Sequence, residues 1–416
     1  MSGPIRKLIG PIHKRLIEQL QHESPISKHL WRNLYVDNVF LSASTFDEAK
    51  SLYFESKKIF SDASMNLREF ISNNEAFNQF LQKEGNPHQK STKILGIKWN
   101  NICDILSFSL PTYCATVLTK RSILKFIASI YDPLGLISPI LVLPKLFLQK
   151  LWKTSLSWDD DLTNELEEEW FSIIKNWDNQ IIPIKRLIDI SHSTSIQLHC
   201  FVDASGHTYG AVAYLRMVDT ISQNISIRII CSKNRLCPIK GMTIPKLELM
   251  ALVIGARVIR FLLDQLDCTI NSIFIWSDSS CALQWLNSSK DLTVFIKNRK
   301  VPEHTVFGHL SSPDNPADII SRGSTPYELI NSKLWWEGPP WLQSDTTLWP
   351  NNISFTLSDI ADKNDETKEH NFNALATTCE NKFTNFINST RYSSFNSLLN
   401  VICHILFFIL KCSKNS

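Results

Sequence analysis

Strand-like and helix-like stretches alternate between about residues 195 and 342, and this alternation limits the possible folds more than any other feature of the sequence. Three strand-like stretches precede a long apolar helix, after which a strand, a helix, a strand and a helix follow. Antiparallel neighbours followed by strands that alternate with helices are typical of an α/β domain with a mixed sheet. We therefore predict such a domain, with flanking helices, in this region.

The remaining parts of the chain predict different structures. Residues 46–70 carry apolar side chains at helical spacing, and residues 94–99 form a strand-like stretch. Residues 120–131 predict a helix, and a later helix is expected to begin after an N-cap at Ser157 or Asp159.

Composition excludes several classes of protein. Hydrophobic residues make up 44% of the 416 residues, against 12 Gly and 18 Pro, which excludes wholesale disorder and collagen. The net charge of +3 does not by itself indicate a nucleic-acid binder, so any site for a polyanion must be local. The ten cysteines include no CxxC pair, which argues against structural zinc.

Targeting signals are also missing from the sequence as read. The N-terminus lacks the apolar core of a secretory signal, and the apolar run at 398–410 is shorter than the roughly 20 residues that span a bilayer. We expect free thiols, no membrane insertion and an intracellular protein, either cytoplasmic or nuclear.

Four carboxylates lie where a predicted strand ends or a predicted helix begins. Asp203 closes a strand and points away from its alternating apolar residues, whereas Glu248 lies in the first turn of the long helix. Asp278 ends an apolar strand, and Asp318 lies near the start of a short helix. Each acid taken alone also has an ordinary interpretation as a turn or helix-terminal residue.

Converging carboxylates at the end of buried strands would repel one another unless cations lie between them. Oxygen ligands suit Mg²⁺ or Mn²⁺, and four carboxylates can hold two such ions about 3.5 to 4 Å apart. The pattern therefore predicts two-metal phosphodiester hydrolysis with no small-molecule cofactor. Basic residues crowd the predicted loop before the Glu248 helix and either contact a phosphate backbone or are simply solvated, namely Lys233, Arg235, Lys240 and Lys246.

The motifs VDAS, IPKLELMA, WSDSS and DNPADIISRG, in this order, resemble the ribonuclease-H-like region of BEL/Pao long-terminal-repeat retrotransposon polyproteins. The resemblance implies a five-stranded mixed sheet and assigns Asp203, Glu248, Asp278 and Asp318 as metal ligands. It implies cleavage of the RNA strand of RNA/DNA hybrids. It also places His309 on a loop near the active site, where it would assist proton transfer or product release.

The stretch NLYVDNVFLSAS resembles the reverse-transcriptase palm hairpin, with Asp37-Asn38 as its two-residue turn. The usual motif is YVDD, whereas this chain reads Tyr35, Val36, Asp37 and Asn38, so the second metal-binding Asp is an amide. Polymerase activity is therefore expected to be lost, and other Pol-derived subunits are possible partners.

Together these features predict an α+β chain of five parts. They are a partial palm (1–119), a helical connection (120–194), a ribonuclease-H-like domain (195–342), a polar linker (343–390) and a truncated helical lead-in to integrase (391–416). Two alternatives to the nuclease remain open: a non-catalytic nucleic-acid-binding remnant, and an unstable relic whose truncated palm exposes an unpaired sheet edge.

Overall fold

The computed structural model describes the greater part of the chain between residues 26 and 356. The described residues are 26, 30, 33–35, 38–86, 91–94, 96–114, 117–177, 180–186, 188, 195–219, 222, 224–288, 301–350 and 354–356. The predicted integrase lead-in and most of the predicted linker lie outside them. No helix among these residues is long and apolar enough to cross a membrane.

A small hairpin is followed in the chain by two helices. Strand β1 (Leu34–Tyr35) pairs with β2 (Asn38–Val39), and Tyr35 lies opposite Asn38. Asn38 is therefore a strand residue, and its predicted place in the turn is wrong; Val36 and Asp37 lie outside the described residues. Helix α3 (Phe46–Asp62) ends earlier than predicted, because Ser64 adopts a positive φ of 61°, and α4 (Glu75–Lys83) follows.

A four-stranded antiparallel sheet joins segments on both sides of the helical connection. Its order is β3 (Ser91–Ile94), β4 (Ile97–Asn100), β5 (Ile105–Ser109) and β6 (Ile181–Lys185). The predicted strand 94–99 is thus the corner of a hairpin, because Gly96 with φ 88° reverses the chain there.

The helical connection consists of three α-helices and a 3₁₀ turn. They are α5 (Lys120–Ala128), η2 (Ser138–Leu141), α6 (Val142–Leu151) and α7 (Asn164–Ile174). Helix α7 begins after Thr163, so neither Ser157 nor Asp159 is its N-cap. The Asp159 carboxylate instead accepts two hydrogen bonds from the Arg121 guanidinium, at 2.7 and 2.9 Å.

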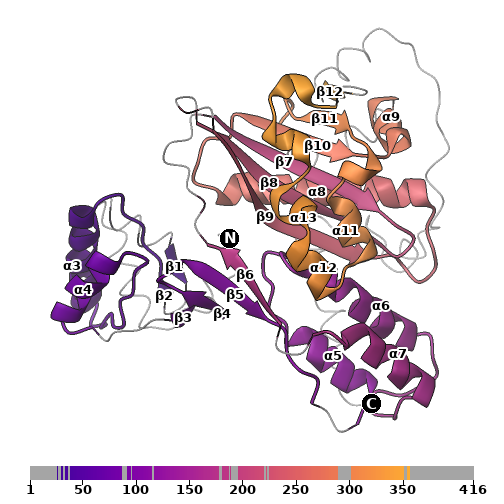
Figure 1. Cartoon of the computed structure of the whole chain (residues 1–416), viewed down its shortest axis with the longest axis horizontal. Helices are drawn as coiled ribbons and strands as arrows, with labels where there is room; N and C mark the ends of the chain where they lie inside the picture. The colour runs from indigo at the N-terminus through magenta and orange to yellow at the C-terminus, as the bar shows by residue number, and fades with distance from the viewer. Residues whose placement is uncertain are drawn as a thin grey trace, which may run out of the picture. The chain divides into compact units, whose positions relative to one another are not determined.

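The larger sheet is mixed and has six strands (Figure 1). In spatial order they are β12 (Ser354–Thr356), β11 (Val306–His309), β10 (Ser272–Ser277), β7 (Ser195–Ala204), β8 (Thr208–Val218) and β9 (Ile225–Leu236). Strand β10 is parallel to both of its neighbours, and the other pairings are antiparallel. This arrangement confirms the predicted mixed α/β fold, with one strand more than the five expected.

The additional strand β12 lies inside the predicted polar linker (343–390). Phe355 of β12 stacks on Phe307 of β11 with ring centroids 5.5 Å apart, and both rings are buried. Arg216 donates hydrogen bonds to the carbonyl oxygens of Leu342 and Ser344. The domain therefore continues past residue 342 because these contacts hold the following segment on the sheet.

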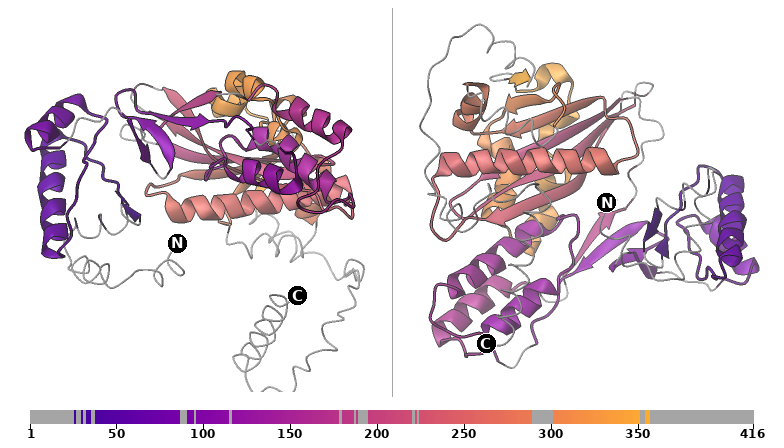
Figure 2. Two further views of the ribbon diagram at one scale, coloured as in Figure 1. Left: turned by 90° about the horizontal axis from the view of Figure 1, so that it is seen from below. Right: turned by 180° about the vertical axis from the view of Figure 1, so that it is seen from behind.

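Helix α8 (Ile244–Gln265) crosses one face of the large sheet, as the right-hand view of Figure 2 shows. Alternate residues of β7, among them Leu198, Cys200 and Val202, pack in the core on this side. Further helices follow in sequence order, namely α9 (Ser280–Ser288), η3 (Ser312–Asp314), α11 (Ala317–Arg322), α12 (Pro326–Asn331), α13 (Lys333–Glu337), η4 (Pro340–Gln343) and η5 (Thr346–Leu348).

The opposite face of the large sheet shares its core with the helical connection. Phe201, Tyr214 and Trp276 of the sheet belong to one buried cluster with Phe147 and Trp170 of the connection. Trp335 in α13 also donates from its indole nitrogen to the Leu136 carbonyl at 2.9 Å. The predicted boundary between residues 194 and 195 is therefore not a boundary between cores.

Candidate metal centre

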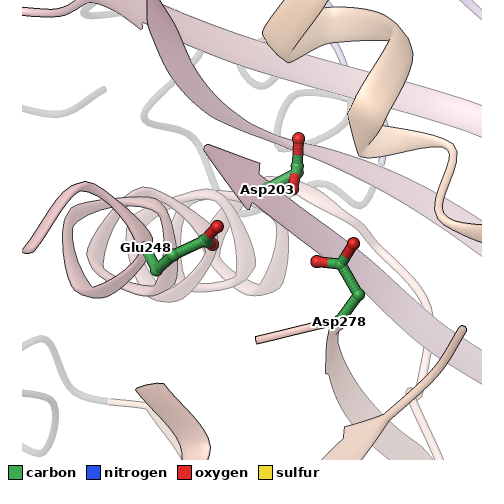
Figure 3. Close-up of side chains that lie close together, drawn as sticks. All are labelled: Asp203, Glu248 and Asp278. Carbon is green, nitrogen blue, oxygen red and sulfur yellow. The ribbon is translucent and has the colours of Figure 1, made fainter. Parts of the chain in front are cut away.

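Three of the four predicted acids converge on one point. Asp203 comes from β7, Glu248 from α8 and Asp278 from the residue after β10, and their side chains turn toward one another in Figure 3. One carboxylate oxygen from each lies within 4.8 Å of the others. The pairing of Ser277 with Val202 in parallel strands explains why Asp203 and Asp278 end side by side.

Glu248 lies one turn further into its helix than predicted. Helix α8 begins at Ile244, so Glu248 opens the second turn, and Thr243 occupies the N-cap position. This placement moves Glu248 away from the helix terminus and over the ends of β7 and β10. A role for Glu248 in stabilising the helix dipole is thereby weakened.

Burial and mutual repulsion act on these carboxylates. Asp203 is only 5% exposed and Glu248 only 8%. Desolvation, followed by the charges of Asp278 and Asp318, raises the pKa of Asp203 to about 6. Desolvation, followed by the charges of Asp203 and Asp278, raises the pKa of Glu248 to about 8. The centre therefore favours either a bound proton or a bound cation.

Asn315 is a site residue that the sequence analysis did not identify. Its side chain is fully buried, and Nδ2 donates to the Val202 carbonyl at 3.1 Å and to Asp278 Oδ1 at 3.3 Å. Its Oδ1 accepts from the backbone N–H of Ala317 at 3.1 Å. One amide thus joins the end of β7, the Asp278 carboxylate and the start of α11.

Asp318 lies near the three converged acids but does not join them. It is in the first turn of α11, and its charge contributes to the raised pKa of Asp203. It is absent from the group of oxygens within 4.8 Å, and its Oδ1 accepts from Arg322 Nε at 2.5 Å. Of the four predicted acids, three converge as a triad, and the fourth forms an ion pair with Arg322.

His309 lies beside the triad but not on the predicted loop. It is the last residue of β11, where it pairs with Ser277 in the parallel ladder. The Nε2–H donates to the Asp278 carbonyl oxygen at 3.2 Å, because a carbonyl can only accept. Nδ1 is buried and has no hydrogen-bond partner within the described part of the chain. This contact supports the backbone that carries Asp278.

The sequence suggested that the four basic residues share one loop, but the structure places them on three different segments. Lys233 and Arg235 are exposed on strand β9, Lys240 lies in the following loop, and Lys246 lies in the first turn of α8. Asp203 pairs with Gly210, and Gly210 pairs with Asn234, which lies between the two β9 residues. Two strand spacings put this part of β9 about 10 Å from Asp203.

The triad fits a hard divalent cation. Its donors are carboxylate oxygens, which Mg²⁺ and Mn²⁺ prefer. Glu248 Oε2 is buried and has no hydrogen-bond partner among the described residues, so a ligand atom is available and costly to leave unpaired. Asp318 Oδ1, by contrast, is already paired with Arg322 Nε.

Several solved structures are similar to this chain. A foamy viral protease-reverse transcriptase in complex with double-stranded DNA is 12% identical and matches 71% of this chain and 47% of its own length, with a TM-score of 0.42. LC11-RNase H1 in complex with RNA/DNA hybrid is 14% identical over 29% of this chain and 88% of its own, with a TM-score of 0.21. RNase H1 from Halobacterium salinarum is 14% identical over 30% of this chain and 91% of its own, with a TM-score of 0.19.

The match thus spans about half of the length of the viral enzyme. Among curated proteins, none matches this chain. Residues 119–279 match the family model described as the Pao retrotransposon-like RNaseH-like domain. The matched segment contains Asp203, Glu248 and Asp278 as well as the helical connection. Residues 119–279 are therefore similar to the RNase H-like domain of Pao retrotransposons.

Proposed function

We propose that this domain hydrolyses the RNA strand of RNA/DNA hybrids with two Mg²⁺ or Mn²⁺ ions, leaving a 3′-hydroxyl and a 5′-phosphate. The convergence of Asp203, Glu248 and Asp278 within 4.8 Å is the observation that carries this proposal. Four buried or half-buried carboxylates in one region would destabilise the fold by repulsion, so a function that requires cations explains why they are there.

Each residue has a separate role in the proposed reaction. When bound, the ions would activate a water molecule and stabilise the charge on the scissile phosphate. Asp203, Glu248 and Asp278 would hold the first ion, and Asp318 would complete the site of the second. Asn315 and His309 would fix the Asp278 carboxylate and backbone, since each already donates a hydrogen bond to that residue.

Substrate recognition would depend on the nucleic-acid backbone. Lys233 and Arg235 are exposed on β9 at about 10 Å from Asp203, a distance at which they could contact phosphates next to the cleavage site. Lys240 and Lys246 would extend this basic surface. Hybrid recognition of this kind uses backbone shape and the 2′-hydroxyl and reads little sequence.

We also propose that the chain belongs to the BEL/Pao class and has no polymerase activity of its own. In the hairpin formed by β1 and β2, Asn38 stands where the palm motif of the family has its second Asp. An amide brings no negative charge to a metal site, so polymerisation would require another Pol-derived subunit.

Cleavage of a labelled RNA/DNA hybrid by the purified chain in Mg²⁺ or Mn²⁺ tests the nuclease. We expect cutting of the RNA strand alone, and a loss of at least about a hundredfold in rate for Asp203→Asn and Asp278→Asn, because each change removes a ligand charge. Asp264→Asn, which changes an acid on the far part of α8, is the matched control and should cleave like the unaltered chain.

The ion pair between Asp318 and Arg322 favours one second candidate, a domain that binds hybrids without cutting them. In that case the fourth acid would be committed to the arginine. Folded protein that binds the hybrid but leaves the RNA intact in both metal ions would establish this alternative and reject the nuclease.

A further inference from the structure

We propose that Arg322 competes with a divalent cation for Asp318, so that the second ion binds only after the Arg322–Asp318 ion pair opens. The inference rests on the proposed metal-dependent function and adds an order of ion binding to it. It gives the triad of Asp203, Glu248 and Asp278 the first ion and makes the second site conditional.

The ion pair is built into one short helix. Asp318 and Arg322 are four residues apart on α11 and therefore share a face of the helix. Arg322 Nε lies 2.5 Å from Asp318 Oδ1, so the guanidinium takes the position next to this oxygen that a cation would need. Gly323, with φ 88°, ends the helix immediately after the arginine.

Arg322 is close enough to act on two acids of the triad as well as on Asp318. The charges of Asp203 and Asp278 act on its guanidinium, in addition to that of its direct partner Asp318. Asp318 in turn acts on Asp203 without belonging to the triad. An arginine in this position supplies positive charge that partly balances the acids before any ion is bound.

The ion pair is weak enough to open. The side chain of Arg322 is 72% exposed and that of Asp318 is 34% exposed, and exposed pairs of this kind contribute little to stability. A divalent cation carries twice the charge of the guanidinium and can also use oxygens of the neighbouring triad. Glu248 Oε2 is buried and has no hydrogen-bond partner among the residues that the structure describes, so no such pair restrains it and the triad takes its ion first.

Calorimetric titration of the full chain with Mn²⁺, repeated by electron paramagnetic resonance of free Mn²⁺, tests this order. The variants are Arg322→Gln, Asp318→Asn and the double variant. Arg260→Gln is the matched control, because Arg260 forms an exposed pair with Asp264 at the same i,i+4 spacing but lies about 18 Å along α8 from Glu248.

We expect two classes of ion site in the unaltered chain. Arg322→Gln should tighten the weaker class about three- to tenfold and change the tighter class less than about twofold. Asp318→Asn should abolish the weaker class, and Arg322→Gln should then have no further effect on it, which is the signature of direct coupling. Arg260→Gln should change neither class.

Other results would overturn the inference in distinguishable ways. If Arg322→Gln raises the Mn²⁺ affinity of both classes equally, the arginine acts only as a remote charge. If it raises neither affinity, the arginine does not compete with the ion. In either case the triad ion and the proposed nuclease remain supported. Glu248→Gln tests the triad site itself. If the unaltered chain binds no Mn²⁺, or if Glu248→Gln leaves all Mn²⁺ binding unchanged, this inference and the proposed function are both rejected.

Discussion

Glu248 is a carboxylate whose charged form is disfavoured by burial and by two neighbouring acids. It is buried against Asp203 and Asp278, and its Oε2 has no partner among the residues described. Its pKa rises from an ordinary value of 4.5 to about 8, so the metal-free folded state holds a proton that the unfolded state loses. This contribution to stability is complete below about pH 4.5 and disappears as the pH rises through about 8.

We therefore expect Glu248→Gln to stabilise the metal-free protein at high pH. Glutamine cannot ionise, so the free energy of unfolding of the variant should exceed that of the unaltered chain by about 1–3 kcal/mol at pH 8.5. The two values should be equal near pH 4.5. Urea unfolding in the presence of a chelator at both values measures this difference. Glu168→Gln, on the exposed side of α7, is the control and should show no such pH dependence. Equal stabilities at pH 8.5 would contradict the argument.

With Mg²⁺ present, we expect the unaltered chain to be more stable than Glu248→Gln. An ion that binds only the folded state adds stability by mass action, and it competes with the proton on Glu248. Mg²⁺ at about 10 mM should raise the melting temperature of the unaltered chain by about 3–8 °C at pH 8 and by less at pH 6. Glu248→Gln should show a smaller rise at both values. A rise that is the same in both proteins would place the ion elsewhere.

The sequence predicted the acids better than their partners. Asp203 and Asp278 could be placed because strand alternation and strand ends are local patterns. The buried amide of Asn315 could not, because its hydrogen bond to the Val202 carbonyl joins residues more than a hundred positions apart. The pair between Asp318 and Arg322 is a local i,i+4 pair, but the sequence does not show whether Asp318 binds the arginine or an ion. The loop position of His309 came from the family resemblance and not from the sequence pattern, and in the structure His309 ends the four-residue strand β11.

At the scale of elements, the centre depends on the contact between α8 and β7. A methyl group at Gly255 of α8 would lie 2.6 Å from Val202 Cγ1, one residue before Asp203. The helix and the strand therefore approach more closely than any other residue at this position would allow. Their spacing sets the distance between Glu248 and Asp203.

Gly255→Ala tests this contact because helix propensity and packing predict opposite signs. Alanine in a helix interior is favoured over glycine by about 1 kcal/mol, whereas overpacking here should cost about 1–3 kcal/mol net. We expect lower stability in urea unfolding together with weaker Mn²⁺ binding. Arg257→Ala, at an exposed position of the same helix, should change stability by less than about 0.5 kcal/mol. A stabilised Gly255→Ala variant would show that α8 can move without cost.

At the scale of the whole molecule, the family segment and the core agree on where the domain begins. The match starts at residue 119, and the connection buries Trp170 and Phe147 in the same cluster as Phe201 and Tyr214. An amphipathic helix shows in its sequence that it has an apolar face but not which surface covers that face. For this reason the sequence did not reveal the core that the connection shares with the large sheet.

A comparison of two fragments tests whether the connection belongs to the nuclease fold. Residues 195–342 lack η2 and α6, which pack against β9 and α11 in the shared core, so this fragment should expose an apolar face and aggregate or unfold. Residues 117–356 retain both layers and β12, and should be monomeric with one cooperative unfolding transition. Trp170→Ala in the longer fragment should lower the stability of that single transition by about 3–5 kcal/mol, because the indole is fully buried. If instead the shorter fragment folds with native near-ultraviolet dichroism and binds Mn²⁺ as the longer one does, the connection is a separate domain and the shared core contributes nothing to the metal centre.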